Sequence, residues 1–200
     1  MKKIAALFVQ TNGSYFGLSD VDPWDIGRDA RLYAGTDPVV AHPPCQLWGP
    51  FAAINYARWG GEHNKPGNDQ GCFASALRSV VQWGGVLEHP ATSRAWKAHG
   101  ITMPVEPGWH RHGLHEWVCI IWQSAYGHRA NKATGLLYVG HVAPLDLDWR
   151  REQGSHQIGY RDQRGPSRNK PTVAKKEASA TPTRFRDTLI SLARHSAGAL

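Results

Sequence analysis

The chain of 200 residues is poor in cysteine and has no long apolar run. These two features argue against a disulfide-rich protein and against a membrane-spanning one. The three cysteines, an odd number, argue against a disulfide framework and favour a reducing compartment. No apolar stretch approaches the roughly 20 residues of a membrane-spanning helix. Residues 4–9 follow two lysines but are too short an apolar stretch for a signal peptide. We therefore expect a cytoplasmic protein that contacts no membrane.

Acidic residues are also outnumbered. Lysine and arginine total 23 against 16 aspartates and glutamates, which gives a formal charge of +7 and an isoelectric point near 9.5. Such a surplus favours a polyanionic partner, and we expect DNA. The length predicts a single unit with a sizeable core, and 41% hydrophobic residues suit a globular protein. The oligomeric state does not follow from composition.

Short apolar runs alternate with helical patterns along the chain. Strands are expected at residues 4–9, 38–41, 86–90, 117–122 and 135–140, and helices at 51–59, 72–83, 93–99 and 184–195. Another helix is expected to start at Asp22 and Pro23, with Asp25 and Asp29 on one face. This order predicts an α/β fold, a three-layer sandwich around a mostly parallel sheet, as in a reduced Rossmann-like core.

The sequence also suggests three parts. Residues 1–149 are expected to form the α/β catalytic core, and residues 150–180 a basic, mobile loop or linker poor in apolar residues. Residues 181–200 are expected to form a C-terminal helix that packs on the core.

The peptide His42-Pro43-Pro44-Cys45 follows the strand at 38–41 and is the stretch around which the chain is organised. Proline cannot donate to a strand ladder, so the strand must stop here and Cys45 sits in a stiff turn. A nucleophile benefits from such a mounting, because its conformational entropy is removed in advance. The alternative interpretation is that Cys45 is not a nucleophile but a small residue buried after the proline turn, as free cysteines often are. Residues 88–90 and 123–132 also follow strands, and ligands of parallel sheets bind at the carboxyl ends of strands.

Three segments resemble motifs of the DNA cytosine-C5 methyltransferases. Residues 43–46, Pro-Pro-Cys-Gln, resemble their proline-proline-cysteine loop, and residues 88–90, Glu-His-Pro, resemble their Glu-Asn-Val motif. Residues 126–134 are similar to their tyrosine-glycine stretch with a Gln-x-Arg-x-Arg core before a strand. The segments occur in the family's order over roughly residues 38–140. Together with the ending at residues 181–187, the chain also resembles small proteins encoded by phages and prophages, which implies a bacterial host cell.

The resemblance implies methyl transfer to cytosine C5 in DNA. Cys45 would add to C6 of the ring, Glu88 would hold N3 and the exocyclic amine, and Lys132 would steady the carbonyl oxygen. The base must leave the duplex to reach these groups. The substrate-binding residues would be His42, Gln46, Trp48, His89 and Arg129. Of these, Trp48 is expected to stack on the base, and His42 or Arg129 to lower the pKa of the Cys45 thiol.

The resemblance also implies the cofactor S-adenosylmethionine. The family binds it with a glycine-rich Phe-x-Gly-x-Gly loop after the first strand, where this chain has residues 9–17 with Asn12 and Gly13. The acidic residue that grips the ribose would be Asp22 or Asp25.

The chain departs from the family pattern at several places. His89 replaces an asparagine, the two family arginines fall on Lys132 and Thr134, and no target-recognition domain follows Gly140. These departures leave a second hypothesis open, in which the protein is a catalytically silent relative of these methyltransferases that a mobile element encodes. It would then bind DNA or a host protein as a decoy or counter-defence factor.

Two further groups of residues were considered. A zinc site, and with it a zinc-dependent hydrolase, could draw on His42, His63, Cys72, His89, His110, His112, His115 and Cys119. The spacing of the last three histidines fits no standard signature, so we expect no metal site. A basic run either is simply solvated or contacts phosphates, and it comprises Arg161, Arg164, Arg168, Lys170, Lys175 and Lys176.

Overall fold

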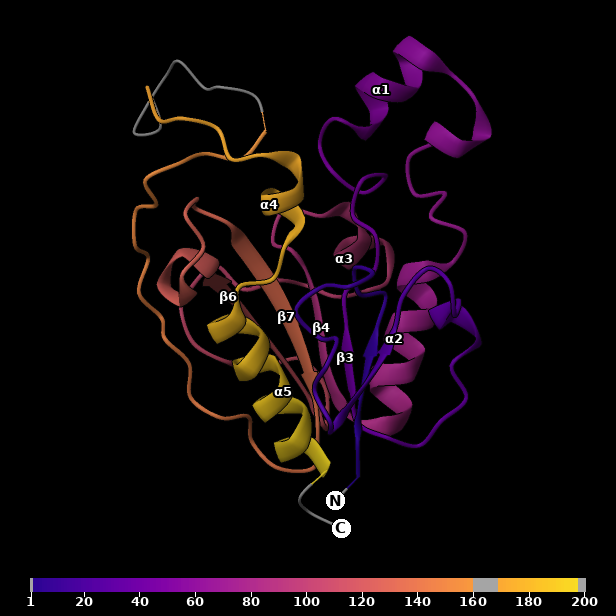
Figure 1. The fold of residues 1–200 in the computed structure, drawn as a ribbon, viewed down its shortest axis with the longest axis vertical. Helices are drawn as coiled ribbons and strands as arrows, with labels where there is room; N and C mark the ends of the chain where they lie inside the picture. Colours follow the sequence, from indigo (N-terminus) through magenta and orange to yellow (C-terminus); the bar gives the residue numbers. More distant parts are fainter. Residues whose placement is uncertain (1, 160–168, 198–200) are drawn as a thin grey trace.

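The structure is a computed structural model that describes residues 2–159 and 169–197. Over these residues it forms one seven-stranded sheet with helices on both faces (Figure 1). The strands are β1 Ile4–Leu7, β2 Val21–Trp24, β3 Val39–Ala41, β4 Gly85–Pro90, β5 His110–Arg111, β6 Glu116–Trp122 and β7 Ala133–Val139. The α-helices are α1 Ala52–Trp59, α2 Cys72–Trp83, α3 Arg94–Ala98, α4 Lys175–Ser179 and α5 Thr183–Ala197, and the short 3-10 helices are η1 Ala30–Leu32, η2 Glu62–Asn64 and η3 Gln123–Tyr126.

The sheet is mixed, in the order β2-β1-β3-β4-β7-β6-β5. The strands β2, β1, β3 and β4 pair in parallel, whereas β7 pairs antiparallel with both β4 and β6, and β5 antiparallel with β6. The α/β class is therefore confirmed, but the prediction of mostly parallel pairing holds only for the first four strands. The reason is local, because residues 123–132 join β6 to β7 without the crossover that parallel strands need.

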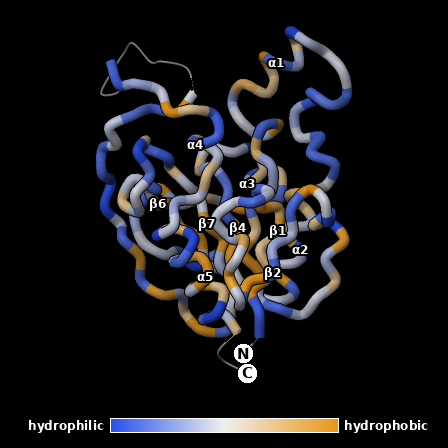
Figure 2. Tube along the Cα trace, in the orientation of Figure 1, coloured by the Kyte–Doolittle hydropathy of each residue, from blue (hydrophilic) through white to orange (hydrophobic). Residues whose placement is uncertain are grey.

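Both faces of the sheet are covered, which explains its uninterrupted apolar strands. On one face α2 packs with Phe73, Ala76 and Val80 against residues that include Leu7 and Ala41. On the other face α5 packs, with core residues that include Ile4, Ala6, Val40, Val86, Phe185, Leu189 and Leu192. The alternation of Ile4 and Ala6 with Ala5 and Leu7 is the two-residue period of a strand. Figure 2 shows hydrophobic residues concentrated where the sheet meets these helices.

The predicted helix at Asp22 and Pro23 is wrong. These residues belong to β2, which pairs with β1 in the register Ala6↔Pro23. Proline is tolerated there because β2 is an edge strand, where its missing N–H need not serve the ladder. Asp25 and Asp29 consequently do not share a helix face. Asp29 instead has a left-handed backbone (φ 45°) and caps η1.

The C-terminal part of the chain lies over the sheet. Among the described residues of 150–180, α4 is helical, and isolated bridges join Ala130 to His156 and Gln157 to Thr172. The helix α5 packs on the sheet beside β4 and β3. The division into three parts stays a prediction, and Arg161, Arg164 and Arg168 lie outside the described residues. In the described part of the chain no helix has the length and apolarity to cross a membrane.

Candidate functional site

Four segments meet at the carboxyl ends of β3 and β4. The chain leaves β3 at His42 and passes through Glu88 near the end of β4, while residues 123–132 connect β6 and β7 at the same edge. The chain runs from β1 outward to β2 and then crosses back to β3 on the other side of β1. This reversal creates a topological switch point between β1 and β3, the place where open α/β sheets bind ligands.

The Cys45 thiol lies on the surface of this edge. Residues 43 and 44 are the predicted prolines, with Pro43 buried and Pro44 exposed, and Cys45 itself is exposed. Partial desolvation of the sulfur and the negative charge of Glu88 raise the pKa of the Cys45 thiol, whereas the positive charge of Lys132 lowers it. The three residues come from segments far apart in sequence, and hydrogen bonds link these segments. His42, three residues before Cys45, contacts the Glu88 carboxylate, and Gln123 donates to both Glu88 and the backbone carbonyl of Lys132. The structure therefore brings the segments of the three predicted catalytic residues to one edge of the sheet.

Glu88 is a buried carboxylate held from both sides. Its Oε2 lies 3.0 Å from His42 Nδ1, and its Oε1 accepts a hydrogen bond of 3.2 Å from Gln123 Nε2. Burial by itself would raise the pKa of Glu88, but the His42 hydrogen bond and the charge of Lys132 outweigh it and lower that pKa to about 2. Glu88 is thus ionised at neutral pH and can only accept hydrogen bonds.

Three further residues extend the hydrogen bonds around His42 and Glu88 and were not predicted as site residues, namely Tyr15, Gln123 and Thr134. The Tyr15 hydroxyl lies 2.8 Å from His42 Nε2, and Gln123 Nε2 also donates to Thr134 Oγ1 at 2.9 Å. A polar chain therefore runs from the loop after β1, across β3 and β4, to the start of β7. The signal for Gln123 and Thr134 was their position at strand ends on the site edge, but nothing in the sequence marked Tyr15.

His89 faces the opposite side of β4 from Glu88, as neighbouring strand residues must. It is fully buried, with its ring against Phe73 and Trp96. Its Nε2 lies 3.5 Å from the carbonyl oxygen of Pro44. Desolvation lowers the pKa of His89 to about 4, so the ring is neutral at pH 7. The His89 ring thus lies in the core and supports the proline turn, and its predicted role in substrate binding stays a prediction.

Other predicted substrate-binding residues occupy different positions. Trp48 donates its indole N–H to Asp69 at 2.8 Å and packs beside Phe73 and His99, so its ring is a structural contact of the loop. Gln46 is exposed beside Cys45. Arg129 is exposed and pairs with Glu177 on α4. The predicted effect of His42 or Arg129 on the Cys45 thiol stays a prediction, and the charged groups that shift the pKa of this thiol here are Glu88, upward, and Lys132, downward.

The candidate cofactor residues lie beside the switch point. Asp22 is already engaged by Arg28 at 2.6 Å and by the Trp24 indole at 2.8 Å. Asp25 directly follows β2 and accepts a 2.7 Å hydrogen bond from the Thr11 hydroxyl in the loop after β1. An acidic residue at the end of the second strand is the usual ribose ligand of dinucleotide-binding α/β folds.

The loop after β1 completes this region. Asn12 has a left-handed backbone (φ 55°), and a side chain at Gly13 would meet the carbonyl oxygen of Gln10 at 2.7 Å. The tight turn therefore requires glycine at position 13. Asp25, next to this turn, is partly exposed, and its other carboxylate oxygen accepts a 3.0 Å hydrogen bond from the Gly27 N–H. Each oxygen can still accept a second hydrogen bond, so the residues fit a ribose.

The histidines do not assemble a metal centre. His110 contacts the carbonyl oxygen of Glu106, His112 pairs with Glu116, and the His115 ring lies against His141. Within residues 2–159 and 169–197 no three histidine, cysteine, aspartate or glutamate side chains cluster as metal ligands would. Cys119 is buried in the core and Cys72 is partly buried at the start of α2.

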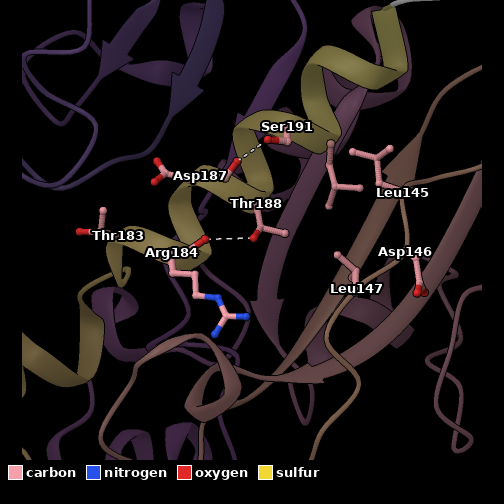
Figure 3. Close-up of a pocket in the computed structure, with 9 residues that line it drawn as sticks. Leu145, Asp146, Leu147, Thr183, Arg184, Asp187, Thr188 and Ser191 are labelled. Atoms are coloured by element: carbon pink, nitrogen blue, oxygen red, sulfur yellow. Dashed lines mark hydrogen bonds between the residues drawn. The ribbon is translucent and has the colours of Figure 1, made fainter.

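Another cleft lies away from this site. A cavity of about 650 Å³ lies between α5 and residues 145–147 and has none of the predicted site residues in its lining. Figure 3 shows that the hydroxyls of Thr188 and Ser191 turn back to the carbonyl oxygens of Arg184 and Asp187, at 3.0 and 2.8 Å. Its polar groups thus serve the helix, and we do not assign the site there.

No family model, curated protein or solved structure matched the chain.

Proposed function

We propose that the protein modifies pyrimidine C5 in DNA, most simply by methyl transfer from S-adenosylmethionine to cytosine through Cys45, on a reduced Rossmann-like core. One observation carries the proposal, namely that hydrogen bonds join the segments of Cys45, Glu88 and Lys132 at the carboxyl edge of the sheet. His42, three residues before the exposed Cys45, contacts the Glu88 carboxylate, and Gln123 donates to both Glu88 and the backbone carbonyl of Lys132. A nucleophile, an anion and a cation in one place are what addition to a pyrimidine ring requires.

Each residue has a defined task in this reaction. The Cys45 thiolate adds to C6, and the ring electrons then make C5 nucleophilic. The Glu88 carboxylate accepts a hydrogen bond from the exocyclic amine, and the Lys132 ammonium stabilises the negative charge that develops on the ring oxygen. Transfer of the methyl group to C5 would break the sulfur–methyl bond of the donor and leave S-adenosylhomocysteine. Water would then take the C5 proton, which restores the C5–C6 double bond, expels the thiolate and regenerates Cys45.

The region for the cofactor supports the same proposal. S-adenosylmethionine would supply the methyl group that C5 takes up. Asp25 at the end of β2 would hold its ribose hydroxyls, beside the turn at Asn12 and Gly13. This region adjoins the Cys45 loop because β1 and β3 are neighbours in the sheet.

Two observations favour a second candidate, the catalytically silent binding factor of a mobile element. The pKa of the Cys45 thiol is raised, so the thiol is protonated at neutral pH until a ligand changes its surroundings. Both oxygens of Glu88 are also already hydrogen-bonded within the protein. A silent relative would retain the fold and DNA binding without transferring a methyl group.

The two candidates are separated by incubating the full chain with duplex DNA and S-adenosylmethionine and measuring 5-methylcytosine by mass spectrometry. We expect product with the native protein and with Cys72→Ser, a thiol control at the start of α2. We expect none with Cys45→Ser. Failure to form product and to bind the cofactor in a calorimetric titration would reject the enzyme and leave the binding factor.

A further inference from the structure

Arg129 and Glu177 form a two-pronged ion pair between the β6–β7 connection and α4. Arg129 Nε donates to Glu177 Oε1 at 2.6 Å, and Arg129 Nη2 donates to Glu177 Oε2. This fork is the geometry with which arginine grips either a carboxylate or a phosphate. The two carboxylate oxygens of Glu177 therefore accept from Arg129 in the way that the two non-bridging oxygens of a phosphodiester would.

The surroundings also suit a phosphate. Arg129 Nη1 lies 3.2 Å from His156 Nε2. Arg129 and Glu177 line a small cleft of about 180 Å³ together with His128 and residues 180–182. Lys132, the residue proposed to act on the pyrimidine, follows Arg129 by three residues in the same connection to β7, so the cleft and the candidate site share one segment.

The helix that carries Glu177 is weakly attached. It has five residues, none of them buried, and no side chain caps its N-terminus. The Arg129 side chain is 55% exposed and that of Glu177 30%. Exposed ion pairs stabilise a fold only slightly and are screened by salt, so a polyanion can compete with Glu177.

From this geometry we infer that Arg129 is a phosphate-binding residue for nucleic acid and that Glu177 occupies its phosphate position until a phosphodiester replaces it. The inference rests on the proposed function for the identity of the nucleic acid. It adds that α4 regulates access, because the chain's own carboxylate competes with the ligand for the same guanidinium.

The test measures binding of a fluorescein-labelled single-stranded DNA oligonucleotide by anisotropy over a series of salt concentrations. All variants carry Cys45→Ser, so that no covalent product forms. Removing the competing charge with Glu177→Gln should tighten binding about threefold to fivefold at low salt. Arg129→Gln removes the phosphate contact itself and should flatten the slope of log K against log salt by about 0.7, the value for one phosphate contact on a single strand.

Two comparisons show whether the effect belongs to Arg129. Arg129→Gln should weaken binding, and Glu177→Gln should have no further effect when Arg129 is already replaced. Glu62→Gln removes the same charge from an exposed carboxylate that pairs with Lys65, and it should leave the affinity nearly unchanged. Equal effects of the two glutamate variants, or a persistent gain in the double variant, would overturn the inference.

These outcomes are independent of catalysis. If 5-methylcytosine is formed but Glu177→Gln binds like the parent, the inference is wrong while the proposed function stands. If the coupling between Arg129 and Glu177 is observed without methyl transfer, the enzyme is rejected and the phosphate site is retained.

Discussion

His42 Nδ1 lies 3.0 Å from Glu88 Oε2, and this contact ties together the ends of the neighbouring strands β3 and β4. Because Glu88 is ionised, His42 must donate its Nδ1 proton to it, which turns Nε2 toward the Tyr15 hydroxyl. The histidine of the His-Pro-Pro-Cys peptide therefore orients the carboxylate. The predicted effect of this histidine on the Cys45 thiol stays a prediction.

The first prediction concerns the reactivity of Cys45. Glu88→Gln removes the negative charge that disfavours the thiolate, so the pKa of the thiol should fall and alkylation at pH 7.5 should accelerate. Lys132→Met removes the opposing positive charge and should slow it. The rate of iodoacetamide labelling at Cys45, followed against pH by peptide mass spectrometry, measures both. Equal rates in the two variants would show that these charges do not reach the sulfur.

The second prediction concerns His89 and acid stability. Its pKa is about 4 in the folded protein against an ordinary value near 6.5, so the unfolded chain binds more protons between these values. Stability should consequently fall as the pH drops from 6.5 to 4, by on the order of 3 kcal/mol. Urea unfolding at several pH values measures the loss. His89→Gln should flatten the curve in this window, and an unchanged slope would contradict the assignment.

Glu88 acts in a lower window, which separates it from His89. Its folded pKa of about 2 lies below the ordinary 4.5, so its stabilising effect is complete above pH 4.5 and is lost as the pH falls toward 2. Asp148, whose pKa is also lowered to about 2, contributes in the same window, so Glu88→Gln should reduce the pH dependence below 4.5 without abolishing it and leave the one above it intact. If Glu88→Gln changed the pH dependence of stability only above pH 4.5, the loss of stability below pH 4.5 would not come from Glu88.

The third prediction concerns Gln123, which donates to both Glu88 and Thr134. Gln123→Leu leaves these buried acceptors with one partner fewer and should destabilise the protein by about 1–3 kcal/mol. Gln82→Leu is the matched control, because Gln82 is exposed on α2 and a surface change of this kind costs about 0.5 kcal/mol or less. Chemical denaturation measures both variants. A Gln123 variant as stable as the control would show that the hydrogen bond from Gln123 to Glu88 contributes little to the stability of the fold.

The fourth prediction distinguishes the two aspartates considered for the cofactor. Asp25→Asn should weaken S-adenosylmethionine binding by about tenfold, the loss expected for a charge-assisted hydrogen bond to a ribose hydroxyl. Asp22→Asn should leave the affinity nearly unchanged, since Asp22 is engaged by Arg28 and Trp24. Isothermal titration calorimetry measures both. The reverse order of effects would move the ribose site into β2.

Local patterns in the sequence predicted most elements but not their pairing. The helix at Cys72–Trp83 and the strand at Val39–Ala41 were identified from apolar spacing and from the residues that end them. The edge strand at Val21–Trp24 was missed because Asp22 followed by Pro23 also begins helices. Only the sheet, where Pro23 lies opposite Ala6, decides between the two structures.

The candidate site was predictable only in part for a similar reason. Cys45 and Glu88 stand at strand ends, which parallel pairing brings to one edge. Tyr15 and the contact between Arg129 and Glu177 depend on where loops return in space, and no periodicity records that. His89 follows Glu88 directly in sequence but faces the core on the other side of the strand.

The most direct test of the site is covalent capture of the protein by DNA that contains 5-fluorocytosine. Fluorine at C5 cannot leave as a proton would, so a cysteine that has added to C6 stays attached once C5 has been methylated. With S-adenosylmethionine present, peptide mapping of the adduct should find the DNA on Cys45 in the native protein and in Cys72→Ser. An adduct on another cysteine, or none under conditions where the protein binds both DNA and cofactor, would contradict the account.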